Sequence, residues 1–138
     1  MLIAGPLVRE RVRWSDLDLM GVVYFGRYLR FMEAAEAEFF RALGFTYDAL
    51  ASEHGVWFAR AHLACDYRAP ARLDDEIVCR AELTKLGGAS LTFAFPIDRA
   101  DGTRLVDGTL AIAAVDRTSL RPARIPEPLR ERLTVASG

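Results

Sequence analysis

The chain has 138 residues and a formal net charge of −1, and 51% of its residues are hydrophobic while 27% are charged. This length suits a single domain, residues 1–138, with one hydrophobic core. The balanced charge argues against a nucleic-acid-binding protein, and no apolar run approaches the roughly 18 residues that a membrane span needs.

The first half of the chain contains one predicted strand and two predicted helices. In residues 7–14 apolar side chains alternate with arginines, which is typical of a half-exposed strand. Residues 47–53 predict a short second helix that ends before Gly55. Between these two segments, residues 27–43 predict a long helix with one apolar stripe, formed by Tyr28, Met32, Ala35, Phe39 and Leu43.

The second half of the chain has the pattern of strands. Residues 57–68 alternate with period two, and their odd positions form an apolar face that includes Trp57 and Leu63. The remaining predicted elements are strands at 76–86, 89–98 and 104–116, tight turns at 87–88 and 101–102, and a short helix at 127–133. Tight turns make consecutive strands antiparallel, so the sequence predicts a four-stranded meander after the helices.

A long helix with one apolar stripe and a sheet with one apolar face bury these surfaces against each other. The sequence therefore predicts an α+β domain. In it, a long central helix is wrapped by a curved antiparallel sheet of about five strands.

Two aspartates precede the long helix in the segment WSDLDLMGVVYFGRY, residues 14–28. Cleavage of an ester or thioester needs a base or nucleophile beside the carbonyl carbon and hydrogen-bond donors for the oxygen that becomes negative. Asp18 can supply the carboxylate, and Gly21 allows the backbone to approach a ligand. The unpaired N–H groups of a helix N-terminus, near Tyr24 and Phe25, can supply the donors. The segment thus has the parts of an acyl-transfer site.

Helix capping is the alternative role for the two aspartates. Asp16 and Asp18 lie nine or more residues before Arg27, too far to cap a helix that begins there. Either could still cap a preceding turn.

One long segment, residues 16–44, resembles the signature of hotdog-fold acyl-CoA thioesterases of the 4-hydroxybenzoyl-CoA thioesterase type; its sequence is DLDLMGVVYFGRYLRFMEAAEAEFFRALG. The later segments FARAHLACDYRAPARLDDEIV, GGASLTFAFPI and DRTSLRPARIPEPL are similar to the Tol–Pal-associated acyl-CoA thioesterases. The resemblance extends over residues 8–133. It implies the hotdog fold, assembled as dimers whose sheets join, commonly into tetramers, with the active site at the dimer interface.

The same resemblance implies roles for individual residues. Asp18 matches the catalytic aspartate, Asp16 matches a structural one, and the backbone N–H of Phe25 matches the donor that polarises the thioester carbonyl. The Tol–Pal subfamily usually has a histidine at the position of Phe25, whereas hydroxybenzoyl-type enzymes have an aromatic residue there. The resemblance therefore leaves the acyl group open, both its length and its aromatic or aliphatic character.

Further candidates concern substrate binding. The expected substrate-contacting residues are Gly21, Val22, Tyr28, Trp57, Phe58 and Ser90. For the phosphates of CoA, the segment SLRPARIPEP resembles the CoA-contacting tail of the family, which makes Arg121 and Arg124 candidates, together with Lys85. Tyr67 and Arg68 fall where the family's strand reaches a neighbouring subunit.

The expected reaction is hydrolysis of an acyl-CoA or acyl carrier protein thioester, with Asp18 as general base or as nucleophile. A hotdog hydratase or dehydratase is one alternative, although it needs a histidine-based proton shuttle. Neither His54 nor His62 lies in such a motif. A non-catalytic acyl-binding or interaction module is the other alternative. No cofactor is expected.

Cysteine and histidine usage bears on metals and on the compartment. Cys65 and Cys79 lie in apolar segments and are expected to be buried thiols rather than a disulfide. With two histidines and no CxxC motif, no metal site is expected. The apolar start of the chain is too short for a secretory signal, so a cytoplasmic protein is expected.

Overall fold

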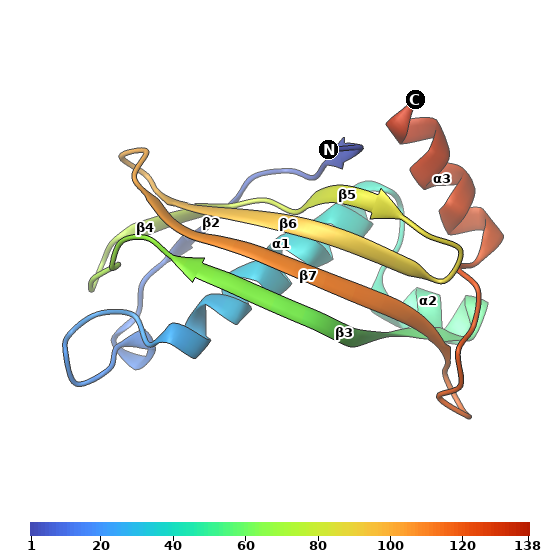
Figure 1. Cartoon of the computed structure of the whole chain (residues 1–138), viewed down its shortest axis with the longest axis horizontal. Coiled ribbons are helices and arrows are strands. Elements are labelled where there is room, and N and C mark those ends of the chain that lie inside the picture. Colours follow the sequence, from blue (N-terminus) through green and yellow to red (C-terminus); the bar gives the residue numbers. More distant parts are fainter.

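The computed structural model describes residues 1–138. A long helix, α1 (Tyr28–Ala42), lies across one face of a seven-stranded antiparallel sheet, as Figure 1 shows. The strands are β1 (Ile3–Ala4), β2 (Val8–Arg11), β3 (Val56–Tyr67), β4 (Glu76–Cys79), β5 (Glu82–Leu86), β6 (Ser90–Arg99) and β7 (Arg104–Asp116), and the other helices are α2 (Tyr47–His54) and α3 (Glu127–Ser137). The predicted architecture, a long helix against an antiparallel sheet, is confirmed.

The seven strands correct the predicted number of about five. The predicted strand 76–86 is two strands, β4 and β5, which both pair with β6. Cys79 lies opposite Ile97 and Glu82 opposite Ala94, so the same register places Pro96 opposite Arg80. Because proline has no N–H, the ladder is interrupted there.

The N-terminal strand is also interrupted. Gly5 and Pro6 separate β1, which pairs with β5, from β2, which pairs with β4. The prediction of a strand up to Trp14 is wrong, because β2 ends at Arg11 and Trp14 begins a 3₁₀ turn with 85% of its surface exposed.

The predicted meander is wrong in one connection. β3 pairs with β7 and not with β4, so the order across the sheet is β4/β5, β6, β7, β3. The turns at 87–88 and 101–102 do join neighbouring strands, but the longer connection 68–75 carries the chain across the sheet. As a result β3 is an edge strand, with one side paired to β7 and the other side free.

A β-bulge at Ala61 changes which residues of β3 face α1. Phe58 and Arg60 lie opposite the buried Ala114 and Ile112, whereas Leu63 lies opposite the buried Leu110. Directly opposed residues point to the same side of a sheet, so the inward positions are even before the bulge and odd after it. The predicted single apolar face of odd residues is therefore wrong.

The core lies between α1 and the sheet. The predicted helix 27–43 is confirmed as α1, preceded by a 3₁₀ turn over Phe25–Arg27, and four of the five stripe residues are buried while Leu43 is half-buried. α3 is longer than the predicted 127–133 and buries Leu129 and Leu133. None of the helices has the length and the apolar composition of a membrane-spanning segment.

Candidate active site

A tight loop before α1 presents Asp18. The backbones of Leu17 and Val23 form an isolated antiparallel bridge, and inside it the N–H of Asp18 donates to the carbonyl of Val22 at 2.9 Å. Gly21 reverses the chain with φ +76°, a conformation that side-chain-bearing residues rarely adopt. A second bridge, between Val22 and Arg72, fixes the loop to the segment that follows β3.

The Asp18 carboxylate is half-buried and only partly engaged. Its Oδ1 accepts a hydrogen bond from the N–H of Met20 at 2.8 Å, which holds the side chain in place. Its Oδ2 has no partner within the chain and forms no ion pair. This oxygen is therefore free to accept a proton from water or to attack a carbonyl carbon.

Asp18 lines a cavity of about 340 Å³ at the N-terminal end of α1. Four of the predicted site residues meet there: Asp18, Val22, Phe25 and Tyr28. Its remaining walls come from Met20, Val23, Tyr67, Arg68, Ala69 and Pro70. Sequence reasoning assigned Tyr67 and Arg68 to a subunit interface and missed this contribution, because the path of the chain after β3 is not encoded in a local pattern.

Two unpaired backbone N–H groups lie at or beside this cavity. The 3₁₀ turn over Phe25–Arg27 runs directly into α1, and the N–H groups of Phe25 and Gly26 donate no hydrogen bond within the chain. The N–H of Tyr24 donates to the carbonyl of Asp16 at 2.8 Å, so the expectation that Tyr24 supplies an oxyanion donor is wrong. The hydroxyl of Tyr67 donates to the carbonyl of Phe25 at 2.9 Å and ties β3 to the start of the helix.

Asp16 has a different environment from Asp18. It is 1% exposed, and its carboxylate accepts two hydrogen bonds from Arg30 of α1, at 2.9 and 2.7 Å. It also accepts the N–H of Arg13 at 2.7 Å and thereby caps the turn that begins at Trp14. Burial acts to raise the pKa of Asp16, but these hydrogen bonds and the charges of Arg30 and Arg27 outweigh it and lower the pKa. These contacts occupy both carboxylate oxygens of Asp16 and give the residue a structural role.

Several predicted substrate contacts lie outside this cavity. Gly21 makes the turn of the loop but does not line the cavity. Trp57 lies opposite Val115, on the face of the sheet turned away from α1, and is 44% exposed. Phe58 stacks on Phe40 at a ring-centroid distance of 5.7 Å as part of the core periphery. Ser90 lies at the start of β6, opposite Ala113.

The three predicted CoA-binding residues are also distant from Asp18 within one chain. The carbonyl of Arg121 accepts the N–H of Asp116, which pairs with Val56 at the start of β3, whereas Tyr67 at the other end of β3 lines the Asp18 cavity. Arg124 lies on the same C-terminal segment, between Ala123 and Ile125, whose N–H groups bind the carbonyls of Ala114 and Gly88. Lys85 lies on β5, opposite Thr92 of β6. The span of β3 separates the Arg121 end from the Asp18 cavity by about 36 Å, whereas Lys85 lies level with the middle of β3, three strands away across the sheet.

Comparison with known proteins identifies the family of this chain. The family model of the thioesterase-like superfamily matches residues 12–133. The chain is 35% identical over 130 residues to the acyl-CoA thioesterase YbgC of Haemophilus influenzae, covering 94% of this chain and 95% of the relative. It is 35% identical over 119 residues to the acyl-CoA thioester hydrolase YbgC of Escherichia coli, covering 86% of this chain and 88% of the relative.

Solved structures agree on the fold. A hypothetical protein from Thermus thermophilus has a TM-score of 0.86 and 32% identity, with 94% of this chain and 98% of that chain covered. The DHNA-CoA thioesterase from Staphylococcus aureus has a TM-score of 0.88 at 18% identity, with 96% and 89% covered, which is a likeness of fold. With the family model matching nearly the whole chain, this protein belongs to the thioesterase-like superfamily and has the hotdog fold.

Proposed function

We propose that this protein is an acyl-CoA thioesterase that converts R–CO–S–CoA and water into a carboxylate and free CoA, with Asp18 as its reactive group. One observation carries the proposal: a carboxylate with a free oxygen and the start of a helix with free N–H groups border the same cavity. The relatives named as acyl-CoA thioesterases support the same reaction.

The proposed chemistry follows from these two groups. The free N–H of Phe25 binds the thioester oxygen, and the positive end of the helix stabilises the negative charge that develops on it. Asp18 then removes a proton from an attacking water, or attacks the carbonyl carbon itself to form an anhydride that water opens. In both routes CoA leaves as the thiolate and takes up a proton. No histidine lines the cavity, so nothing favours hydratase chemistry, which needs a proton shuttle.

The test of this reaction is the release of free thiol from a panel of acyl-CoA and acyl carrier protein thioesters. Turnover of at least one thioester, together with no hydration of enoyl-CoA, is the expected result. Binding of acyl-CoA without thiol release would instead identify a non-catalytic acyl-binding module. We further propose that the protein acts in the cytoplasm, since its two cysteines are free thiols.

The free edge of β3 supports assembly into a homo-oligomer. An unpaired edge strand is a template for pairing with another chain, and β3 is long and carries exposed apolar side chains, Trp57, Leu63 and Tyr67. We expect light scattering at micromolar protein to give at least a dimer, and a tetramer if dimers pair again. A single species at the chain mass of 15.4 kDa would contradict this.

Pairing of two β3 edges would also bring the CoA-binding candidates Arg121 and Arg124, which lie far from Asp18 within one chain, closer to the Asp18 cavity of the partner. Two copies related by a two-fold axis pair antiparallel, which brings the Val56 end of one β3 beside the Tyr67 end of the other. Arg121 and Arg124 of the partner subunit then lie toward the Asp18 cavity. Both arginines are exposed and form no ion pair of their own, so their donors are free for phosphate.

We therefore expect an Arg121→Ala, Arg124→Ala double variant to have a raised KM for acyl-CoA with little change in kcat. These contacts are equally strong in the ground state and the transition state, so their loss weakens binding alone. Steady-state kinetics on acyl-CoA and on the matching acyl-pantetheine thioester, which has no nucleotide, measures this. Equal losses on both substrates would show that the arginines support the structure.

A further inference from the structure

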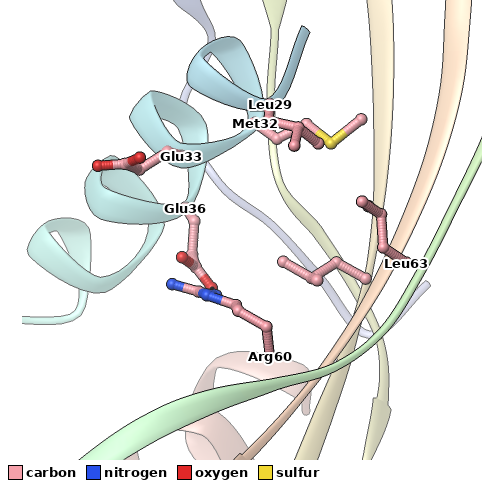
Figure 2. A pocket seen from close by; sticks show the side chains of 7 residues that line it. Leu29, Met32, Glu33, Glu36, Arg60 and Leu63 are labelled. Atoms are coloured by element: carbon pink, nitrogen blue, oxygen red, sulfur yellow. Dashed lines mark hydrogen bonds and ion pairs between the residues drawn. The ribbon is translucent and has the colours of Figure 1, made fainter. Parts of the chain in front are cut away.

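A second cavity, of about 310 Å³, lies between α1 and β3. Figure 2 shows side chains from both elements converging on it. Four of its residues are apolar and three are charged: Leu29, Met32, Leu63, Leu110, Glu33, Glu36 and Arg60. No residue of this cavity belongs to the Asp18 cavity.

Residues that line the two cavities are neighbours on both elements. On α1, Tyr28 of the Asp18 cavity is followed by Leu29 of the second cavity. On β3, Tyr67 and Leu63 share the inward face. Between them Met32 reaches Gly108, where a Cβ atom would meet the methionine methyl carbon at 2.3 Å. A methionine side chain changes rotamer easily. A path from Asp18 along α1 requires Met32 to rotate and passes the rings of Tyr28 and Tyr67, whose centroids are 5.7 Å apart.

The far end of this path is crossed by an ion pair. Arg60 of β3 reaches over to α1, where its Nη1 donates to Oε1 of Glu36 at 2.6 Å (Figure 2). Glu36 is 1% exposed, and its Oε2 accepts the hydroxyl of Tyr47 at 2.5 Å. The pair therefore links the edge of the sheet to the helix.

The bulge at Ala61 is the reason that Arg60 points into the second cavity, which we call the α1–β3 groove. If strict alternation continued backward from Leu63, Ala61 would face α1 and Arg60 would face outward. The extra residue instead places Arg60 opposite the buried Ile112. Bulges occur frequently beside active sites, where they redirect a side chain.

We propose that the Glu36–Arg60 pair sets the maximum length of the acyl chain that this protein accepts. This inference rests on the proposed thioesterase function. A saturated acyl chain that begins at Asp18 runs along α1 over Leu29 and Met32. It meets the ion pair after about 12 Å, the rise from Tyr28 to Glu36.

A longer chain has no low-energy place at that point. To pass, it must displace Arg60 and leave the buried Glu36 carboxylate with Tyr47 as its one remaining partner. Arg60 is 48% exposed and can move into solvent, but the Glu36 carboxylate is 1% exposed, so the cost of displacement lies in leaving that buried charge without its ion-pair partner. A chain that ends before the pair meets apolar side chains only, apart from Glu33 at the open side.

The experiment compares two double variants with the wild type. Glu36→Gln with Arg60→Ala removes both charges, shortens the side chain that crosses the groove, and keeps an acceptor for Tyr47. Glu38→Gln with Arg41→Ala makes the same changes in the exposed Glu38–Arg41 pair of α1 and is the matched control. The measurement is kcat/KM for saturated acyl-CoAs of increasing length, with thermal unfolding to verify folding.

We expect the wild type to lose activity sharply beyond one chain length. In the Glu36→Gln, Arg60→Ala variant, here the groove variant, the ratio of kcat/KM for longer chains to kcat/KM for shorter chains should rise at least about tenfold. The control variant should keep the wild-type dependence of kcat/KM on chain length. An unchanged profile in the groove variant, or the same shift in the control, would overturn the proposal. If the groove variant does not fold, Leu63→Phe tests the same path from the other side. It should move the optimum to shorter chains, and an unmoved optimum would count against the groove.

Failure of the proposed function can be distinguished from failure of this inference. If the wild type hydrolyses no thioester, calorimetry with free saturated carboxylates of increasing length measures the groove without catalysis. The same displacement of the length limit in the Glu36→Gln, Arg60→Ala variant is then expected. Binding that does not depend on chain length in either protein would refute the length limit itself.

Discussion

Asp18→Asn should lower kcat for thioester hydrolysis by about 10²–10⁴-fold while leaving the fold intact. The amide keeps the size of the side chain and can still accept the N–H of Met20, but it neither takes up a proton at neutral pH nor attacks a carbonyl carbon. Thiol release under saturating substrate measures the loss, and thermal unfolding verifies the fold.

Asp48→Asn is the matched control for this variant, because Asp48 is an exposed aspartate in the first turn of α2, outside the Asp18 cavity. It should keep wild-type kcat. If Asp16→Asn abolished turnover in a folded protein while Asp18→Asn did not, the assignment of the reactive carboxylate to Asp18 would be wrong.

The second large effect is on stability and concerns Asp16. Asp16→Ala should lower the free energy of unfolding by about 3 kcal/mol, because it leaves Arg30 without the carboxylate that accepts two of its hydrogen bonds. Arg30 is 24% exposed and retains Glu10 as a partner. The expected loss of unfolding free energy is therefore at the lower end of the range of about 3–5 kcal/mol for breaking a buried ion pair. Denaturant unfolding at neutral pH measures it.

Asp18→Ala is the control for this substitution, since it removes an aspartate from the same loop. Asp18 gives up one hydrogen bond, to Met20, and no ion pair, so its loss should cost about 1 kcal/mol or less. Equal losses in the two variants would mean that the Asp16–Arg30 pair does not stabilise the protein.

The contribution of Asp16 should also depend on pH in a defined direction. Because the pKa of Asp16 is lowered in the folded state, its stabilising effect is complete above the unfolded pKa of about 3.9. The effect is lost as the pH falls through the lowered, folded-state pKa. The difference in unfolding free energy between the wild type and Asp16→Ala should thus be constant near neutrality and shrink below about pH 4. A difference that persists unchanged in strong acid would contradict the pairing.

What the sequence could predict is the part of the fold that depends on local pattern. The apolar stripe of α1 and the turn at 101–102 are set by neighbouring residues, so the helix and the β6–β7 hairpin could be predicted. The pairing of β3 with β7 depends on a crossing of the sheet, which no residue spacing records. Pro96 interrupts a strand to which it does not belong, so the break between β4 and β5 was visible only once the register was known.

In the candidate site, too, the residues that are neighbours in the sequence could be predicted and the distant ones could not. Asp18, Val22, Phe25 and Tyr28 lie close together in the sequence, and the structure brings them to one cavity. Trp57 was expected beside them, but the bulge at Ala61 turns its side chain to the opposite face. Such a bulge inserts a residue without breaking the hydrophobic pattern, and period-two reasoning therefore misassigns every residue on one side of it.

The contacts of Asp16 bear on how the loop that carries Asp18 forms during folding. Its carboxylate binds Arg30 in α1 and its carbonyl accepts the N–H of Tyr24, so a single residue fixes both ends of the segment that carries Asp18. Until the first turns of α1 exist, the guanidinium of Arg30 is not in place, and the loop is closed by backbone contacts alone, such as the bridge between Leu17 and Val23. We therefore expect the position of Asp18 to become fixed only when α1 has formed and Arg30 binds Asp16.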